Sequence, residues 1–311
     1  MTNLPCSELG LATPIERVRV GVLAEKDIQL IIKREDLRHP QISGNKFHKL
    51  KYNLDYAKRE GFSAVASFGG AWSNHLHALA YAGKQQGLNT IGFIRGPLPQ
   101  PLNAMLKDAQ SWGMDLRPLS YGDYRRRYED DFCQELMASV TNGYLIPEGG
   151  AGQLAVRGCA ELGAEIVAQT PGMDYLCVAC GTGATMAGLI AGVKGRATVL
   201  GFSVIKNNHK LQSDIRSWLP EHCLQKPWRI IEGYDCGGFG KLSQQLVAFM
   251  DQWHSHSSIP LEPLYTGKML YGLFHLIDAD YFPPASKVVV LHSGGLQGLR
   301  GMESEMEKYR S

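Results

Sequence analysis

The sequence predicts an α/β protein whose sheets are mostly parallel. Apolar runs typical of buried strands alternate with segments of helical periodicity along most of the 311 residues. Apolar strands separated by helices are typical of parallel sheets that helices cover on both faces. Glycine-rich turns also follow three of these strands, at the end where open α/β sheets bind ligands. Together these observations favour an α/β ligand-binding protein.

The expected elements follow one another in order. Strands are expected where β-branched and aromatic residues gather in short runs, and helices where apolar residues recur at a spacing of three or four. The expected strands cover residues 29–33, 63–68, 90–94, 116–119, 144–147, 175–179, 199–205, 229–232 and 287–291. The expected helices cover residues 45–59, 73–86, 102–112, a segment after 131, 184–192, 242–253 and 268–277.

Composition and charge narrow the class of protein. Apolar residues make up 44%, charged residues 20%, and the net charge is +2, so we expect no nucleic-acid partner and no membrane partner. The basic cluster at 125–127 is interpreted as a solvated helix face. Seven cysteines indicate reduced thiols in a cytoplasmic protein, with Cys177 and Cys180 as small buried residues of a strand. Residues 1–10 lack the pattern of a signal peptide.

Three glycine-rich turns are the most informative feature. They are Gly69-Gly70, the segment 181–185 and Gly294-Gly295, each after an expected strand. The segment 181–185 (GTGAT) has glycines for close backbone approach, two threonine hydroxyls and a following helix start, which suits a phosphate group. Met186 occupies the third glycine position of a dinucleotide fingerprint. The same segment alone is equally compatible with a structural turn.

A lysine stands at an unusual place in the helix expected over 45–59. Lys46 is just inside the helix start, where the helix dipole disfavours a cation. The dipole and desolvation both favour a neutral amine there, and a neutral amine is required to form an imine. Lys49, Lys51 and Lys58 are interpreted as ordinary solvated lysines.

Taken together, these motifs resemble the fold-type II enzymes that use pyridoxal 5′-phosphate (PLP). The chain is most similar to the branch with 1-aminocyclopropane-1-carboxylate (ACC) deaminase and D-cysteine desulfhydrase. The matching motifs run through nearly the whole chain in the family's order. They are Lys33-Arg-Glu-Asp36, Gly44-Asn-Lys46, Gly69-Gly-x-x-Ser-Asn74, Gly181-Thr-Gly-Ala-Thr185, Leu264-Tyr-Thr-Gly-Lys268 and His292-Ser-Gly-Gly295.

The resemblance implies a role for each matching residue. Lys46 would form the Schiff base and move the proton at Cα, while Ser73 and Tyr265 would stand beside the substrate as further catalytic residues. Asn74 would bond the cofactor's 3′-oxygen, and Ser293 would face the pyridine nitrogen. The phosphate would be held by Gly181, Thr182, Gly183, Ala184 and Thr185.

The resemblance also implies an architecture and a reaction. Residues 49–149 would form a smaller lobe, and residues 1–48 with 150–311 a larger PLP-binding lobe like that of the tryptophan synthase β-subunit. The expected activity is that of a lyase or deaminase on a small amino acid, by Cα deprotonation and β-elimination to a 2-oxo acid and ammonia. D-Cysteine is the favoured substrate. ACC deaminase-like ring opening, or PLP binding with another substrate or no turnover, stays open. A homodimer is expected.

Three departures from the family bear on the substrate. Phe239 stands where both named enzymes carry a tyrosine, which removes a hydroxyl that Tyr234 would have to replace. Trp72 stands where relatives usually have glutamine, and we expect its indole to reshape the pocket. Thr266 stands where ACC deaminases carry glutamate, which favours the desulfhydrase side.

Two other enzyme classes fit the sequence less well. A nicotinamide-dependent oxidoreductase would need the third glycine and an acidic residue at the next strand end, where Gly201-Phe202 stands. A zinc enzyme would use His75 and His77, but two residues two positions apart on a helix point in different directions.

Overall fold

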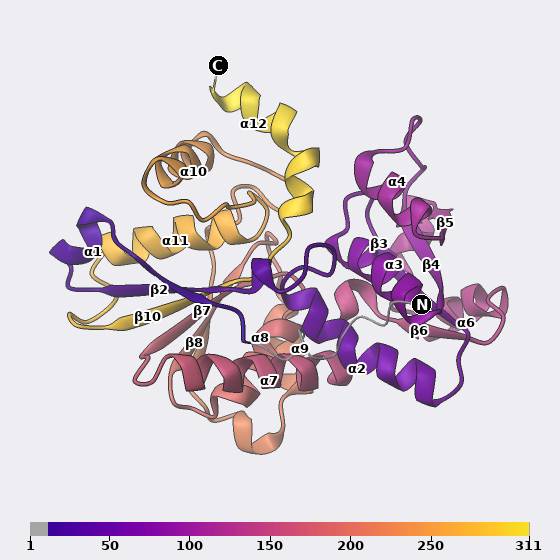
Figure 1. Cartoon of the computed structure of the whole chain (residues 1–311), viewed down its shortest axis with the longest axis horizontal. Helices are drawn as coiled ribbons and strands as arrows, with labels where there is room; N and C mark the ends of the chain where they lie inside the picture. The colour runs from indigo at the N-terminus through magenta and orange to yellow at the C-terminus, as the bar shows by residue number, and fades with distance from the viewer. Residues whose placement is uncertain (1–11, 311) are drawn as a thin grey trace.

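The computed structural model describes residues 12–310, and its strands form two sheets (Figure 1). The larger has the order β1-β2-β10-β7-β8-β9, with β1 antiparallel to β2 and the other neighbours parallel. The smaller has the order β5-β4-β3-β6 and is parallel throughout, so the predicted class is confirmed. The strands are β1 (Ile15–Val18), β2 (Gln29–Arg34), β3 (Ala64–Gly69), β4 (Asn89–Arg95), β5 (Met114–Leu119), β6 (Gly143–Ile146), β7 (Tyr175–Cys180), β8 (Thr198–Ser203), β9 (Trp228–Ile231) and β10 (Lys287–His292).

Helices cover both faces of the larger sheet (Figure 1). Successive side chains of β10 show this, because Val288 and Val290 join the apolar cluster of α10 and α11, whereas Val289 and Leu291 join that of α7, α8 and α9. These strands are therefore apolar on both faces. The helices of this part are α1 (Gly21–Glu25), α7 (Gln153–Gln169), α8 (Ala184–Val193), α9 (Leu211–Trp218), α10 (Gln244–His256), α11 (Thr266–Asp278) and α12 (Glu303–Arg310).

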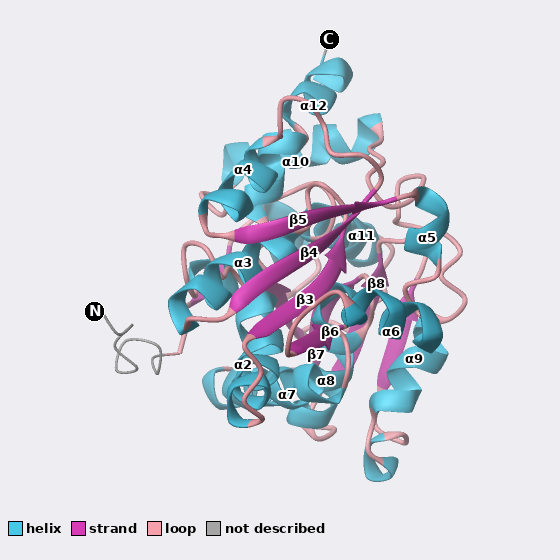
Figure 2. Cartoon of the chain, turned by 90° about the vertical axis from the view of Figure 1, so that its right-hand side faces the viewer, coloured by secondary structure: helices cyan, strands magenta, loops and turns pink. Residues whose placement is uncertain are grey.

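The smaller sheet lies between two further layers of helices (Figure 2). Helices α2, α3 and α4 pack on one face with Val65 and Ile94, while Phe68 and Phe93 on the other face pack with Tyr124 of α5 and with α6. The helices of this part are α2 (Asn45–Arg59), α3 (Asn74–Gln86), α4 (Ala104–Ser111), α5 (Tyr121–Arg125) and α6 (Asp130–Ala138). Four short 3₁₀ helices complete the fold: η1 (Glu35–Leu37), η2 (Glu148–Gly150), η3 (Glu221–Cys223) and η4 (Leu296–Gly301).

All the expected strands and helices are present, with ends that differ by a few residues. Helix α7, the longest helix among the described residues, was not predicted from the sequence, and neither were β1, α1, α5, α9 and α12. Glycines within α7 obscured its periodicity, because glycine weakens an isolated helix. The lobe boundaries proposed at residues 48/49 and 149/150 stay a prediction.

Helix α7 owes its place to close contact with α2. A Cβ atom on Gly158 would lie 2.0 Å from the backbone oxygen of His48, so only glycine allows the two backbones to approach this closely. The helix therefore needs its glycines for packing even though they lower its intrinsic stability. This contact holds α2, which begins with Asn45 and Lys46, against the helix layer of the larger sheet.

Cys177 and Cys180 are buried free thiols of β7, as predicted. The basic cluster was interpreted only partly correctly, because Arg125 and Arg126 are exposed whereas Arg127 is half-buried and pairs with Glu148. Over residues 12–310, no helix has the length and apolar character required to cross a membrane.

A substitution at the α2–α7 contact tests this packing. We expect Gly158→Ala to destabilise the protein by about 1–3 kcal/mol, because the new methyl group overlaps the His48 carbonyl. The measurement is thermal unfolding followed by circular dichroism. The control is Gly122→Ala in α5, where a Cβ would have its nearest neighbour at 3.5 Å. Equal melting temperatures for the two variants would contradict the close contact.

Candidate active site

The start of α2 and two of the glycine turns meet between the two sheets. The backbone N–H of Asn45 donates to the oxygen of Ser293 at 3.2 Å. A Cβ on Gly44 would lie 1.9 Å from that same oxygen. On the other side of the turn, a Cβ on Gly295 would lie 2.8 Å from Asn74 Nδ2. The structure therefore brings the expected lysine helix, the amide of α3 and the turn after β10 into direct contact.

The turn after β7 joins the same site. Gly183 has φ +86° and precedes α8, and among the described residues no side chain caps this helix start. Free N–H groups at a helix start bind anions well. Asn45 Nδ2 donates to Thr185 Oγ1 at 2.9 Å, and a Cβ on Gly181 would lie 3.4 Å from the Tyr265 ring. The segment 181–185, called the cradle below, is thus suited to hold an anion, and the Tyr265 ring lies beside it.

Lys46 is the second residue of α2 and is partly buried. Burial, with the nearby positive charge of Lys49, holds the pKa of the Lys46 amine well below its ordinary value. This shift favours the neutral, nucleophilic form of the amine, which an imine-forming lysine requires.

Lys49 corrects a prediction, because it is not a solvated lysine. It is buried on the same helix as Lys46, and its Nζ donates to the Gly149 oxygen at 2.7 Å and lies 3.4 Å from Thr182 Oγ1. Burial lowers the pKa of Lys49 to about 8. An amine that is largely protonated at neutral pH therefore lies beside the cradle. Lys51 and Lys58 are exposed, as predicted.

Ser73 and Asn74 lie at the start of α3. The Ser73 hydroxyl caps the helix by accepting from the Leu76 N–H at 3.2 Å, which leaves its own proton to donate. The Asn74 side-chain oxygen accepts a hydrogen bond from Gln297 Nε2 at 2.5 Å. This bond sets the orientation of the amide, so Asn74 Nδ2 is the group presented beside Gly295.

Tyr265 immediately precedes α11 and faces the cradle. Burial, followed by the charges of Glu262 and Glu148, raises the pKa of its phenol, so Tyr265 stays protonated and acts as a donor. Phe239 lies beside it with ring centroids 5.8 Å apart, so the missing hydroxyl would have stood next to Tyr265. Tyr234 instead packs among core rings of α11 and β8.

Thr266 and Trp72, the other two positions that differ from the family's pattern, each contact a specific neighbour. Thr266 is buried, and its hydroxyl lies 3.1 Å from a carboxylate oxygen of Glu262, which also accepts from the Thr266 N–H at 2.6 Å. The Trp72 ring lies against Gly301, at the end of η4. The effect of Trp72 on the shape of the pocket stays a prediction.

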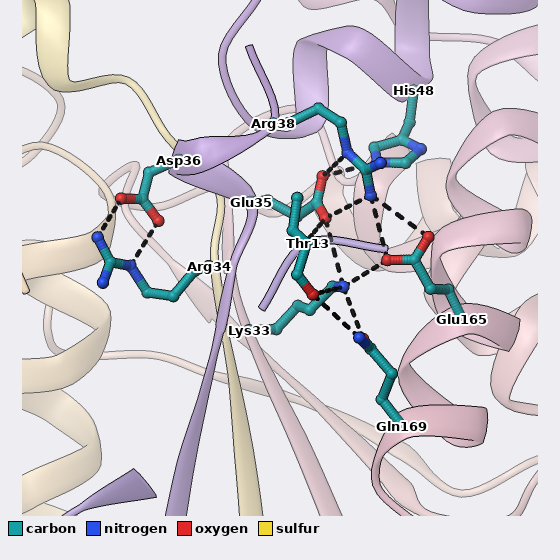
Figure 3. Close-up of polar contacts among 9 residues, drawn as sticks. All are labelled: Thr13, Lys33, Arg34, Glu35, Asp36, Arg38, His48, Glu165 and Gln169. Carbon is teal, nitrogen blue, oxygen red and sulfur yellow. Dashed lines mark hydrogen bonds and ion pairs between the residues drawn. The ribbon is translucent and has the colours of Figure 1, made fainter. Parts of the chain in front are cut away.

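A buried network of ion pairs and hydrogen bonds connects β2 with α2 and α7 (Figure 3). Lys33 and Glu35 are both fully buried, and Lys33 Nζ donates to Gln169 at 2.6 Å and to the backbone oxygen of Thr13 at 2.8 Å, with a further short bond to Glu165. Because Glu165 and Gln169 belong to α7, the network joins β2 to that helix.

Glu35 links the same network to the lysine helix. Its carboxylate contacts His48 Nε2 at 2.8 Å and Arg38 Nη2 at 3.0 Å (Figure 3). Burial opposes the charge of Glu35, but hydrogen bonds from His48 and Arg38 outweigh it and lower its pKa to about 2. His48 lies two residues beyond Lys46, so the Glu35 carboxylate directly positions the start of α2.

The two histidines of α3 turn to different partners. His75 Nε2 lies 2.9 Å from Ser67 Oγ, and its Nδ1 has no hydrogen-bond partner among the described residues. His77 lies 3.4 Å from Asp108 and packs on Trp112. Burial keeps the pKa of both imidazoles below the ordinary value. Within residues 12–310, no cluster of three or more metal-ligating side chains occurs.

Comparisons with known proteins agree with this geometry. Residues 7–294 match the family described as "Pyridoxal-phosphate dependent enzyme". A "Putative 1-aminocyclopropane-1-carboxylate deaminase" of Pyrococcus horikoshii is 28% identical over 297 residues, covering 92% of this chain and 90% of the relative. A bifunctional D-cysteine desulfhydrase/1-aminocyclopropane-1-carboxylate deaminase of Arabidopsis thaliana is 28% identical over 331 residues, covering 97% and 82%. A crystal structure of an ACC deaminase homologue superposes with a TM-score of 0.83 at 26% identity, covering 97% and 94%.

The chain therefore belongs to the pyridoxal-phosphate-dependent enzymes, as the sequence predicted, and PLP is its cofactor. The residues present fit this group. The cradle at 181–185, with Lys49 beside it, suits the phosphate, and the neutral amine of Lys46 suits the aldehyde carbon. Asn74 Nδ2 and the turn 293–295 lie next to each other and would both be available to the ring.

The Glu35 network predicts a specific acid sensitivity. The pKa of Glu35 is depressed in the folded protein, so its contribution to stability is present above about pH 4.5 and lost as the pH falls towards 2. We expect Glu35→Gln to destabilise the protein by about 3–5 kcal/mol at pH 7, because buried cations lose their partner. The variant should also lose less stability than the wild type between those pH values, as measured by urea unfolding.

The control for this experiment is Glu161→Gln, which breaks an exposed pair with Lys51. We expect it to cost about 1 kcal/mol or less. A free energy of unfolding of Glu35→Gln equal to that of the wild type would show that the network does not hold β2, α2 and α7 together.

Lys49 predicts a pH-dependent affinity for the cofactor. We expect Lys49→Met to weaken PLP binding by about tenfold or more, because the phosphate loses a buried cation. In the wild type, affinity should also fall as the pH rises above about 8, where free Lys49 loses its proton, and Lys49→Met should lack this component. Fluorescence titration of the apoprotein with PLP measures both effects. Lys51→Met is the control on the same helix, and an equal effect of both variants would contradict the assignment.

Proposed function

We propose that this enzyme is a lyase that removes a β-substituent and ammonia from a small amino acid, and that D-cysteine is its best substrate. With D-cysteine, the reaction would convert the amino acid and water into pyruvate, hydrogen sulfide and ammonia. The observation that supports the proposal is that the helix start with Lys46, the helix start with Ser73 and Asn74, and the Tyr265 ring adjoin the glycine turns at 181–185 and 293–295.

Each residue would have a distinct task. PLP, when bound, supplies an electron sink for the charge that develops at Cα. Lys46 would hold the cofactor and take the proton from Cα, since its amine is neutral. Ser293, beside the start of α2, offers only a hydroxyl to the ring, and such a weak proton source suits elimination, where the leaving group carries charge away.

Protons for the leaving group would come from Tyr265 or Ser73. Tyr265 stays protonated because burial raises its pKa, and Phe239 beside it has no hydroxyl that would change this. The Ser73 hydroxyl already accepts the helix-capping bond, so its proton is available to the substrate. Either residue would therefore be able to serve as the donor while Lys46 serves as the base.

The names of the relatives support the proposal and its main alternative, ring opening of ACC. Thr266 favours the desulfhydrase side, because it occupies the position where ACC deaminases carry a glutamate and here bonds to Glu262. PLP binding without turnover is the remaining alternative.

A spectroscopic titration tests the proposal. We expect the visible band of the bound cofactor to shift on adding D-cysteine, with release of sulfide and pyruvate, and to respond less to L-cysteine, D-serine or ACC. Lys46→Ala should still bind the amino acid with added PLP but release no product, whereas Lys58→Ala, an exposed lysine of α2, should behave as the wild type. Turnover of ACC alone, or product formed only when an added nucleophile is incorporated, would overturn the D-cysteine lyase assignment.

A further inference from the structure

Four polar side chains, those of Tyr124, Arg127, Tyr128 and Glu148, form a cluster that has no part in the proposed reaction. The carboxylate of Glu148 accepts from Tyr124 Oη at 2.5 Å, from Arg127 Nε at 2.7 Å and from Tyr128 Oη at 3.0 Å. The Arg127 guanidinium lies over both tyrosine rings, 4.6 and 4.3 Å from their centroids. Glu148 is therefore held rigidly.

The cluster stands at the carboxyl end of the smaller sheet. Glu148 follows β6 and begins η2, and the next two residues contact the site directly. A Cβ on Gly149 would lie 3.2 Å from the Thr182 side chain, and one on Gly150 would lie 3.1 Å from His75. Lys49 also bonds to the Gly149 oxygen. Glu148 therefore directly precedes two residues that contact the segment 181–185, Lys49 and His75.

The electrostatics of the site agree with this placement. Burial is the main cause that lowers the pKa of Lys46, and the charge of Glu148 acts in the opposite direction. Burial and then Glu262 raise the pKa of Tyr265, and Glu148 adds to that rise. The carboxylate is thus near enough to act on both residues that would flank a substrate.

The hydrogen bonds of the cluster determine what it can offer to a ligand. All three guanidinium nitrogens of Arg127 are engaged, with Glu148, the Tyr124 backbone oxygen and the Tyr128 hydroxyl. One oxygen of Glu148 accepts two bonds, whereas the other accepts one from Tyr124. Since a carboxylate oxygen has two lone pairs, Glu148 can accept one further hydrogen bond at the oxygen that Tyr124 contacts, while three of the five N–H groups of Arg127 are directed to partners within the cluster.

We propose that the Glu148 carboxylate contacts the side chain of the amino-acid substrate. It favours a side chain that donates a hydrogen bond, such as a thiol, hydroxyl or amine. A carboxylate side chain is disfavoured because it would lie beside the fixed carboxylate of Glu148, whose hydrogen bonds with Arg127 and the two tyrosines hold it in place. This inference rests on the proposed function, since it assumes that an amino acid lies beside Lys46. It limits the substrates to cysteine-, serine- or diaminopropionate-like compounds and excludes aspartate-like ones.

The test compares binding across matched ligands in the PLP-loaded protein. Dissociation constants for D-serine, D-2,3-diaminopropionate, D-alanine and D-aspartate are obtained from the initial change of the cofactor band in stopped flow. In the wild type, the two donor side chains should bind more tightly than alanine, and aspartate should bind most weakly. In Glu148→Gln, the aspartate-to-serine ratio of affinities should rise by about tenfold or more, because Arg127 loses its partner.

Two further variants keep the test decisive. Arg127→Met should move the ratio the other way, since it leaves the carboxylate without its cation. Glu129→Gln removes the same charge from an exposed residue that pairs with Arg126, and it should leave the ratio unchanged. Ratios in Glu148→Gln and Arg127→Met that equal that of Glu129→Gln would overturn this inference alone. A wild-type band that no amino acid perturbs would overturn the proposed function and this inference with it.

Discussion

The buried carboxylate of Glu35 is the charge on which the placement of the site depends. It lies one residue beyond β2, yet it bonds to His48 of α2 and shares Arg38 with Glu165 of α7 (Figure 3). A buried charge is tolerated only when its partners compensate it, so moving any of these elements would leave uncompensated charges. One side chain therefore fixes the lysine helix relative to the larger sheet.

The rest of the site is built from this fixed point. The Glu35 backbone oxygen accepts from the Gly44 N–H at 3.0 Å, which turns the chain into α2 beside the Ser293 carbonyl. On the other side, Asp36 pairs with Arg34 at 2.7 Å and lies 3.6 Å from His292, which leads into that same turn. These contacts run from the segment 33–36 both to the helix start that carries Lys46 and to the turn at 293–295, so one network positions both.

Two lysines three residues apart on α2 have different surroundings, and these suit them to different tasks. Lys46 is partly buried and Lys49 is buried on the same helix, and of the two only Lys49 contacts oxygen atoms among the described residues, at Gly149 and Thr182. Lys46 is the more strongly neutralised of the two, which suits a nucleophile and base. Lys49 keeps a proton up to about pH 8, which suits an anion partner.

The sequence by itself determined the alternation of strands and helices, the glycine turns at strand ends and the lysine at a helix start, because these depend on neighbouring residues. It did not reveal α7, whose glycines serve a contact with α2, nor the burial of Lys49. It also did not show that Arg127 leaves solvent to hold Glu148. Only the tertiary structure decided these features, because burial and ion pairing depend on segments that are distant in the chain.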